Sequence, residues 1–264
     1  MDEVTLPGGR TVGAVLAGEV VHKAASPAAP AVHALLRHLA EAGFDGAPRA
    51  LGFDAQGRQM LTYLRGETIG ERNPWPAWVF ADTTLVQVGR WLRRVHELAA
   101  AFVPPDDASW FISARMGPGM VFGHQDAAPY NAVVDGDRLV GFCDWDIAGP
   151  TWPELDLGYS ALMWVPLHPP GTGQPLDPDN GADRYRRLHL LLDAYGYTAD
   201  RREFATAIPQ RARRQAGVIR RMADAGDPAS IALLFFAEQL ERSAAHVEAL
   251  PEEFWFGSEP GRTT

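Results

Sequence analysis

The chain has 264 residues, of which 46% are hydrophobic and 22% charged, so it can bury a large core without disulfide bonds. Its single cysteine, Cys143, excludes an internal disulfide framework and a cysteine-rich zinc site. The 24 Lys and Arg against 33 Asp and Glu leave a net charge of −9, which argues against a general nucleic-acid binder and suits a cationic ligand. The acidic N-terminus is no targeting segment and no apolar run approaches the roughly 20 residues that span a bilayer, so we expect a cytoplasmic protein without a membrane partner.

Residues 1–66 are expected to form a small β-rich lobe with one helix. Two short apolar stretches within 12–23 predict a hairpin, and apolar residues at helical spacing over 31–42 predict a helix that stops at Gly43. Residues 52–58 are expected as a turn-rich link into a strand at 59–64.

Residues 67–264 are expected to form a second, larger and mostly helical lobe. One helix is predicted from an apolar stripe of Leu85, Val88, Leu92, Val95 and Leu98. Asp-Gly at a turn predicts a hairpin over 133–140, the Pro- and Gly-rich stretch 166–178 predicts a loop, and 231–250 predicts one apolar helix. The fold class is therefore α+β in two lobes.

The segment 123–159 carries the chemistry. His124 and Asp126 stand two positions apart, Asn131 follows five positions later, and Asp144 lies beyond the predicted hairpin. This is the spacing of a kinase catalytic loop followed by a metal-binding aspartate. A carboxylate can accept the proton of an acceptor hydroxyl, and two further oxygen ligands can hold Mg²⁺ against nucleotide phosphates. For any one of these acids alone, a solvated loop carboxylate is the alternative interpretation; the ordered set favours catalysis.

These residues resemble the motif of aminoglycoside phosphotransferases and related small-molecule kinases, commonly written His-Gly-Asp-x-x-x-x-Asn, then Asp-Trp or Asp-Phe, then Asp-Leu. Here the three parts read HQDAAPYN over 124–131, CDWDIAG over 143–149 and DLGY over 156–159. The resemblance implies a protein-kinase-like fold with a nucleotide between the lobes, Asp126 as catalytic base, and Asn131 and Asp144 as Mg²⁺ ligands.

The resemblance also assigns supporting roles. His124 is expected to brace the loop, Asp156 to bond backbone amides near it, and Asp146 to support the metal site without binding the metal. Lys23 is the candidate for the strand lysine that contacts the α- and β-phosphates, with an exposed edge-strand lysine as the alternative. The linker that meets the nucleotide base through backbone groups would contain Tyr63 and Leu64.

The match weakens in the N-terminal part. Gln125 replaces the usual Gly after the motif His, and the glycines within 8–13 form no G-x-G-x-x-G loop. The acid that normally pairs with the strand lysine is not evident, because residues 31–39 contain none and Glu41 falls near the helix end.

The sequence therefore predicts a Mg²⁺-dependent small-molecule kinase that transfers the γ-phosphoryl of ATP or GTP to a hydroxyl of a small acceptor, with antibiotic resistance as one role the resemblance raises. The alternatives are a non-catalytic kinase-like binding or immunity protein and a metal-dependent hydrolase. Acids that could meet a cationic acceptor are Asp183, Asp193, Glu238 and Glu241.

Overall fold

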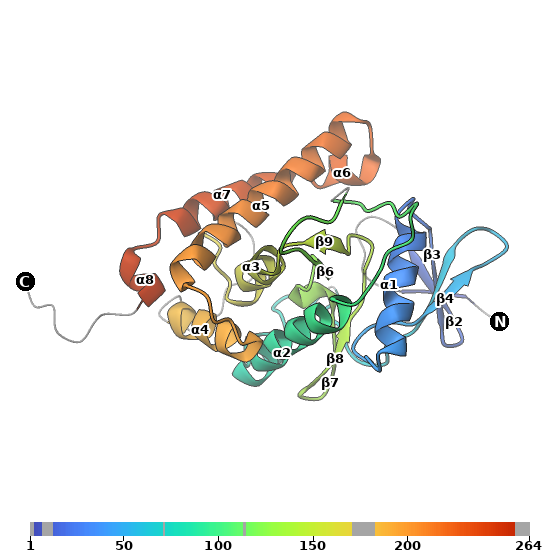
Figure 1. The fold of residues 1–264 in the computed structure, drawn as a ribbon, viewed down its shortest axis with the longest axis horizontal. Coiled ribbons are helices and arrows are strands. Elements are labelled where there is room, and N and C mark those ends of the chain that lie inside the picture. The colour runs from blue at the N-terminus through green and yellow to red at the C-terminus, as the bar shows by residue number, and fades with distance from the viewer. Residues whose placement is uncertain (1–2, 7–12, 71, 113–114, 171–182, 257–264) are drawn as a thin grey trace, which may run out of the picture.

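A computed structural model describes residues 3–6, 13–70, 72–112, 115–170 and 183–256. The sheet and helix α1 lie at one end of the molecule and the long helices at the other, with α3, β6 and β9 between them (Figure 1). The strands are β1 (Val4–Thr5), β2 (Ala14–Ala17), β3 (Val20–Lys23), β4 (Ala50–Phe53), β5 (Gln59–Thr62), β6 (Val121–Gly123), β7 (Ala132–Asp135), β8 (Arg138–Phe142) and β9 (Gly149–Thr151). The α-helices are α1 (Ala29–Glu41), α2 (Asp82–Ala99), α3 (Pro153–Trp164), α4 (Arg184–Tyr195), α5 (Arg201–Asp224), α6 (Pro228–Ala232), α7 (Leu234–Glu248) and α8 (Glu252–Phe256), and two short 3₁₀ turns cover Ala77–Phe80 and Pro129–Asn131.

Five antiparallel strands form the N-terminal sheet in the order β1-β2-β3-β5-β4. The predicted hairpin within 12–23 is confirmed for the residues that the structure describes, with Gly18 at positive φ (63°) in its turn. In the next pairing Lys23 lies opposite Gln59. The predicted link over 52–58 is wrong at its start, because residues 50–53 form β4. A register shift between Ala50 and Gly52 interrupts the alternation by which a strand is recognised.

The two predicted helices of the first hundred residues are confirmed as α1 and α2. Each is amphipathic and buries one face, as the apolar spacing requires. Helix α2 buries Leu85, Val88, Leu92 and Val95 completely, and α1 packs on both β4 and α2. The apolar stripes thus place α1 between the sheet and the helical part.

The C-terminal part is helical as expected, with one correction. The apolar stretch 231–250 is not one helix: α6 ends at Ala232 and α7 begins at Leu234. Asp227 caps α6 by accepting a bond from the amide of Ser230, and Pro228 occupies the first turn, so a separate short helix starts there. Phe235 is 69% exposed, which shows that the apolar character of this stretch reflects solvent-facing side chains as well as core.

The carbonyl of Gly46, in the loop after α1, joins the sheet end to the helical part. It accepts hydrogen bonds from Trp91 Nε1 at 2.8 Å and from the amide of Phe142 at 3.2 Å. A Cβ on Gly141 would lie 2.2 Å from the same carbonyl oxygen, so this close approach requires glycine. The predicted hairpin over 133–140 is confirmed as β7 and β8, with Gly136 at φ 63° in its turn.

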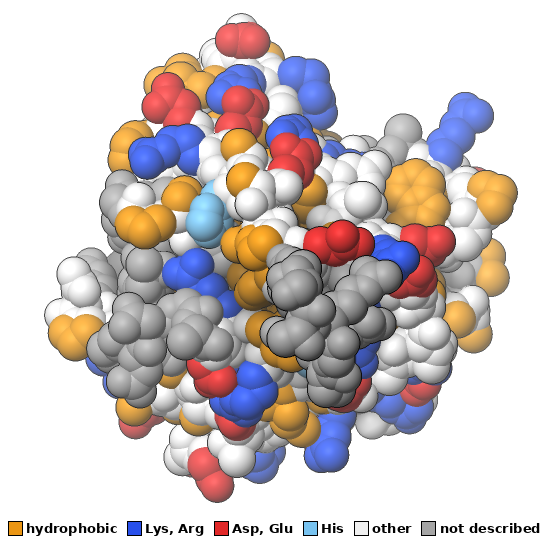
Figure 2. Space-filling model, turned by 90° about the vertical axis from the view of Figure 1, so that its left-hand side faces the viewer, with side chains coloured by type: hydrophobic (Ala, Val, Ile, Leu, Met, Phe, Trp, Pro, Cys, Tyr) orange, Lys and Arg blue, Asp and Glu red, His pale blue; other side chains and the backbone are white. Residues whose placement is uncertain are grey.

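No helix in the described ranges is long and apolar enough to cross a membrane. Basic and acidic side chains are interspersed over the part of this helical side that is drawn in colour (Figure 2). Two predicted features fall partly outside the described residues, namely the glycine segment 8–13 before residue 13 and the loop 166–178 beyond residue 170.

Gly89 allows α2 and α4 to approach closely. A Cβ there would lie 2.8 Å from the carbonyl oxygen of Leu191 and 2.9 Å from Cβ of Ala194. Gly89→Ala should therefore push the helices apart and lower the free energy of unfolding by about 1–3 kcal/mol, as measured by urea denaturation. Exposed Arg90→Ala is the matched control, and equal stability of the two variants would contradict this account.

Candidate active site

The site is organised around a carboxylate that is completely buried. Asp156, in the first turn of α3, accepts bonds through Oδ2 from His96 Nε2 (2.9 Å) and the amide of His124 (3.1 Å), and through Oδ1 from the amide of Gln125 (2.7 Å). Burial alone would raise the pKa of Asp156, but the bond from His96 and the other donors hold it below its usual value. The carboxylate therefore remains charged and fixes the loop 124–126, in keeping with the role that the motif resemblance implies.

Two backbone features let Asp156 reach the loop. Gln125 has φ 64°, in the left-handed region, which explains why glycine is the usual residue at this position of the motif. The amide side chain of Gln125 donates to the carbonyl of Ile147 at 3.1 Å. A Cβ on Gly123 would lie 2.2 Å from Asp156 Oδ2, so that position requires glycine, a constraint that sequence reasoning missed.

His124 connects the loop to the segment after β8. Its Nδ1 accepts from the amide of Asp126 (3.1 Å) and its Nε2 donates to the carbonyl of Cys143 (2.9 Å), so the ring carries its proton on Nε2. Burial lowers the pKa of His124, in keeping with a neutral ring. These contacts are those expected of a residue that braces the loop.

Asp126 is half-buried and both of its oxygens are engaged. Oδ1 accepts from the Tyr130 hydroxyl at 2.7 Å, and Oδ2 accepts from Asn131 Nδ2 at 2.9 Å. Burial raises the pKa of Asp126 to about 7, with the charge of Asp144 acting in the same direction and the bond from Tyr130 against it. A carboxylate of this basicity is suited to accept a proton near neutral pH.

Tyr130, Tyr159 and Arg211 complete the surroundings of Asp126 and were not identified as site residues from the sequence. The Tyr130 and Tyr159 hydroxyls lie 2.9 Å apart, and the Arg211 guanidinium stacks 4.7 Å from the Tyr159 ring centre. Arg211 Nη2 donates to the carbonyl of Gln125 at 2.6 Å and is 1% exposed. Arg211 therefore lies in the core beside the loop and not on a solvated helix face, and its spacing of three from buried Ile208 was the available signal.

Asn131 and Asp144 are brought together by backbone pairing. The amide of Cys143 donates to the carbonyl of Asn131 at 2.9 Å, which places Asp144 beside the end of the loop. Because Asn131 Nδ2 is used by Asp126, the side-chain atom of Asn131 that can bind a metal is its oxygen. One amide oxygen and one carboxylate are hard ligands that fit Mg²⁺ bound jointly with phosphate oxygens. No cluster of three His, Cys, Asp or Glu suited to a metal occurs among the described residues.

Lys23, at the end of β3, contacts Asp144. Its Nζ is 2.5 Å from Asp144 Oδ1 and 2.6 Å from Asp146 Oδ2, and its side chain is 12% exposed. Strand β3 lies between β2 and β5, so the alternative of an exposed edge-strand lysine is wrong. Lys23 is also the only lysine among the 264 residues, a signal that was available in the sequence.

Tyr63 and Leu64 follow β5 directly. The amide of Tyr63 donates to the carbonyl of Glu19 at 2.9 Å, so this group is used within the sheet. Three residues beyond Leu64, Glu67 pairs with Val134 of β7 through two backbone bonds of 2.7 and 2.9 Å. The segment therefore crosses from the sheet to the β7–β8 hairpin, the course expected of a linker.

Three of the four acids proposed for a cationic acceptor form ion pairs within the described part of the chain. Asp183 pairs with Arg186, Asp193 with Arg201 and Glu241 with Arg220. Each of these three charges is thus balanced by a separate arginine. Glu238 is the one acid of the four without an ion pair among the described residues.

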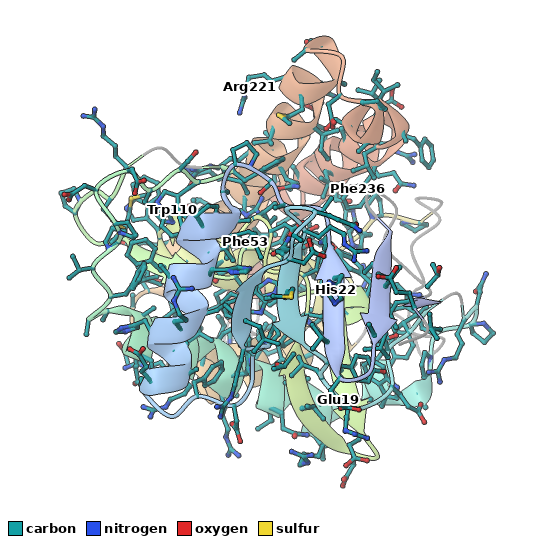
Figure 3. The ribbon with its side chains drawn as sticks, turned by 90° about the vertical axis from the view of Figure 1, so that its right-hand side faces the viewer. Glu19, His22, Phe53, Trp110, Arg221 and Phe236 are labelled. Atoms are coloured by element: carbon teal, nitrogen blue, oxygen red, sulfur yellow. The ribbon has the colours of Figure 1, made fainter. Side chains whose placement is uncertain are left out.

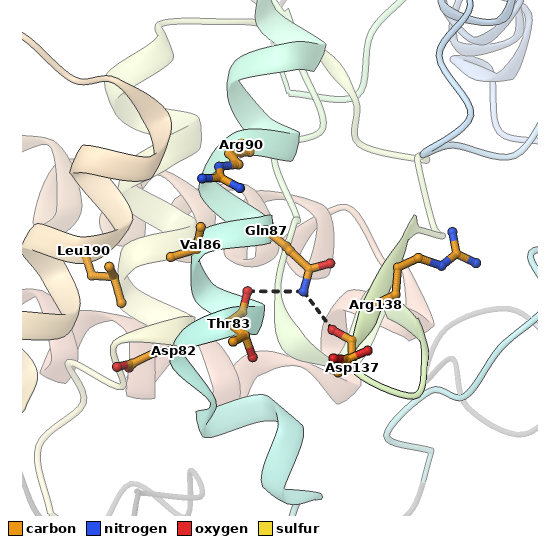
Figure 4. Close-up of a pocket in the computed structure, with 8 residues that line it drawn as sticks. All are labelled: Asp82, Thr83, Val86, Gln87, Arg90, Asp137, Arg138 and Leu190. Carbon is orange, nitrogen blue, oxygen red and sulfur yellow. Dashed lines mark hydrogen bonds between the residues drawn. The ribbon is translucent and has the colours of Figure 1, made fainter.

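One surface pocket is lined by residues of α2, of the β7–β8 hairpin and by Leu190 of α4 (Figure 4). Gln87 spans it, donating to the carbonyls of Thr83 (3.2 Å) and Asp137 (2.8 Å). The pocket shares no lining residue with the candidate site, and Gln87 joins the helix to the hairpin across it.

Loss of the Asp156 charge should destabilise the protein. Asp156→Asn should lower the free energy of unfolding by about 3 kcal/mol at pH 7, because a buried ionic hydrogen-bond network is broken. Since the folded pKa is depressed, this difference should shrink as the pH falls below about 4, where the unfolded carboxyl becomes protonated. Urea denaturation at several pH values measures it, with Asp135→Asn, 71% exposed, as the control. Equal stability of the two variants at pH 7 would rule out the anchoring role.

Comparison with known proteins agrees with this geometry. The sequence pattern of the phosphotransferase enzyme family matches residues 110–191. The chain is 32% identical over 206 residues to the trifolitoxin immunity protein of Rhizobium leguminosarum bv. trifolii, covering 76% of this chain and 77% of the relative.

Solved structures show the same fold at low sequence identity. An amicoumacin kinase in complex with AMP-PNP, Ca²⁺ and Ami superposes with a TM-score of 0.62 at 13% identity, over 90% of this chain and 87% of the other. A choline/ethanolamine kinase family protein from Mesorhizobium loti superposes with a TM-score of 0.55 at 17% identity, over 94% and 92%. The expected two-part α+β fold of protein-kinase-like phosphotransferases is confirmed, and the chain belongs to the phosphotransferase enzyme family.

Proposed function

We propose that the protein is a Mg²⁺-dependent small-molecule kinase that transfers the γ-phosphoryl of ATP or GTP to a hydroxyl group. The observation that carries the proposal is the meeting of Lys23, Asp126, Asn131 and Asp144 where the sheet joins the helical part. The amicoumacin kinase complex holds a nucleotide analogue and a divalent cation, which supports the same pair of ligands here.

The residues divide the work of transfer. Asp126 orients the acceptor hydroxyl and takes its proton as the acceptor oxygen bonds to the γ-phosphorus and the bond to the β-phosphate oxygen breaks. Lys23 contacts the nucleotide phosphates, and its charge favours their binding. Asn131 and Asp144 hold Mg²⁺, which when bound neutralises phosphate charge. Asp146 and His124 keep these groups in place.

The immunity relative gives a specific reason to keep a second candidate, a non-catalytic protein that binds a toxin or another small molecule. Such a protein would bind its ligand without consuming nucleotide. The complete set of Asp126, Asn131 and Asp144 favours the kinase, since sequestration alone requires none of them.

Removing the base should affect turnover more than binding. Asp126→Ala should reduce kcat by about 10²–10⁴-fold, because proton acceptance is lost, and leave nucleotide affinity nearly unchanged. The assay follows NTP consumption with an acceptor found by screening hydroxylated compounds, aminoglycosides first. Exposed Asp135→Asn serves as control, and near-normal turnover of Asp126→Ala would show that another group is the base.

Removing either metal ligand should abolish the benefit of Mg²⁺. Calorimetric titration with ATP and with GTP, each with and without Mg²⁺, should show binding strengthened by Mg²⁺ in the wild-type protein. Asn131→Ala and Asp144→Ala should lose that strengthening, since each removes one of two protein oxygens. An unchanged Mg²⁺ effect in both would refute their assignment. Failure of the wild-type protein to bind either nucleotide at millimolar concentration would favour the binding-protein alternative.

A further inference from the structure

Lys23 takes both of its carboxylate partners from one segment of the helical part. Asp144 and Asp146 approach its Nζ at 2.5 and 2.6 Å. Helix α1 supplies no acid between residues 31 and 39, although an acid of this helix normally orients the phosphate-binding lysine in kinases. The orientation of Lys23 therefore depends on residues outside α1.

Asp146 is itself held from the sheet. Its Oδ2 faces Lys23, and its Oδ1 accepts from Gln59 Nε2 at 3.3 Å. Gln59 is 2% exposed, also donates to the carbonyl of Ala24 at 3.2 Å, and stands directly opposite Lys23 in the β3–β5 pairing. Lys23 and Gln59 on adjacent strands and Asp146 in the segment between β8 and β9 thus form one cluster, with each Asp146 oxygen assigned to one partner.

The α1 side of this cluster carries an imidazole. His33 is fully buried and stacks on Phe53 of β4, with ring centres 4.7 Å apart (Figure 3 labels Phe53 at the edge of the sheet beside α1). Burial lowers the pKa of His33, whereas the Gln59 side chain and the charge of Asp146 act against that shift. Position 33 of α1 is therefore occupied by a residue that cannot supply a carboxylate.

We propose that Asp146 is the positioning residue of Lys23 and takes the role of the acid that α1 lacks over residues 31–39, with Gln59 as its brace. The proposal rests on the nucleotide site proposed above. When the Asp144 carboxylate binds a metal ion, it no longer pairs with Lys23. The Asp146 carboxylate then holds the ammonium toward the phosphates. Lysine orientation is then independent of the position of α1.

The first test needs no nucleotide. Because the chain has one lysine, acetic anhydride labels a single side-chain amine, and peptide mass spectrometry gives its rate. Labelling of Lys23 should be several-fold faster in Asp146→Asn than in the wild-type protein, and moderately faster in Gln59→Ala. Asp135→Asn, on the exposed end of β7, should label at the wild-type rate. An unchanged rate in both Asp146→Asn and Gln59→Ala overturns the proposal.

The second test measures nucleotide binding by calorimetry. Asp146→Asn should weaken ATP or GTP binding about tenfold, the loss expected for one ionic hydrogen bond, and keep the ratio of affinities with and without Mg²⁺. Loss of that ratio with unchanged Lys23 labelling would make Asp146 a metal ligand and overturn the proposal. If the wild-type protein binds no nucleotide, the kinase assignment fails, while the labelling comparison still decides whether Asp146 positions Lys23.

Discussion

The arrangement of the site depends on the buried, ionised carboxylate of Asp156. Three donors from α2 and from the loop after β6 converge on it, so a single charge links two helices and the segment that carries Asp126. Its place in the first turn of α3 suits an anion, because the unpaired amides of a helix start favour negative charge. Gly123 and the left-handed Gln125 are the backbone conditions for this convergence. Asp126 is therefore positioned by core electrostatics and not by the surface loop alone.

A second electrostatic contact joins the sheet to this core. The ammonium of Lys23 lies between Asp144 and Asp146 and offsets two carboxylates that would otherwise repel each other. The Gly46 carbonyl makes an independent, uncharged connection through Trp91 and Phe142. The ionic contact lies at the site and can respond to ligands, whereas the carbonyl contact is built into the packing.

Much of the fold could be predicted from local patterns. The α1 and α2 stripes and both hairpins follow from spacing and turn residues, and the order of His124, Asp126, Asn131 and Asp144 indicated the loop. Helix α3 could not be recognised from periodicity because it is buried on nearly every side, and the break at Leu233 lies inside a continuous apolar run. The partners of Lys23 depend on contacts across more than 120 positions of the chain, which no local pattern encodes.

The bond from Tyr130 to Asp126 has a consequence for recognition. With Asp126 as the base, an entering alcohol meets an oxygen that already holds a phenol, at 2.7 Å. Where the alcohol takes the place of the phenol on that oxygen, the exchange gains little free energy, since one hydrogen bond of similar strength replaces the other. Selectivity among alcohols must then come from the rest of the acceptor molecule, and a small competitor such as water displaces poorly a phenol that is tethered in place.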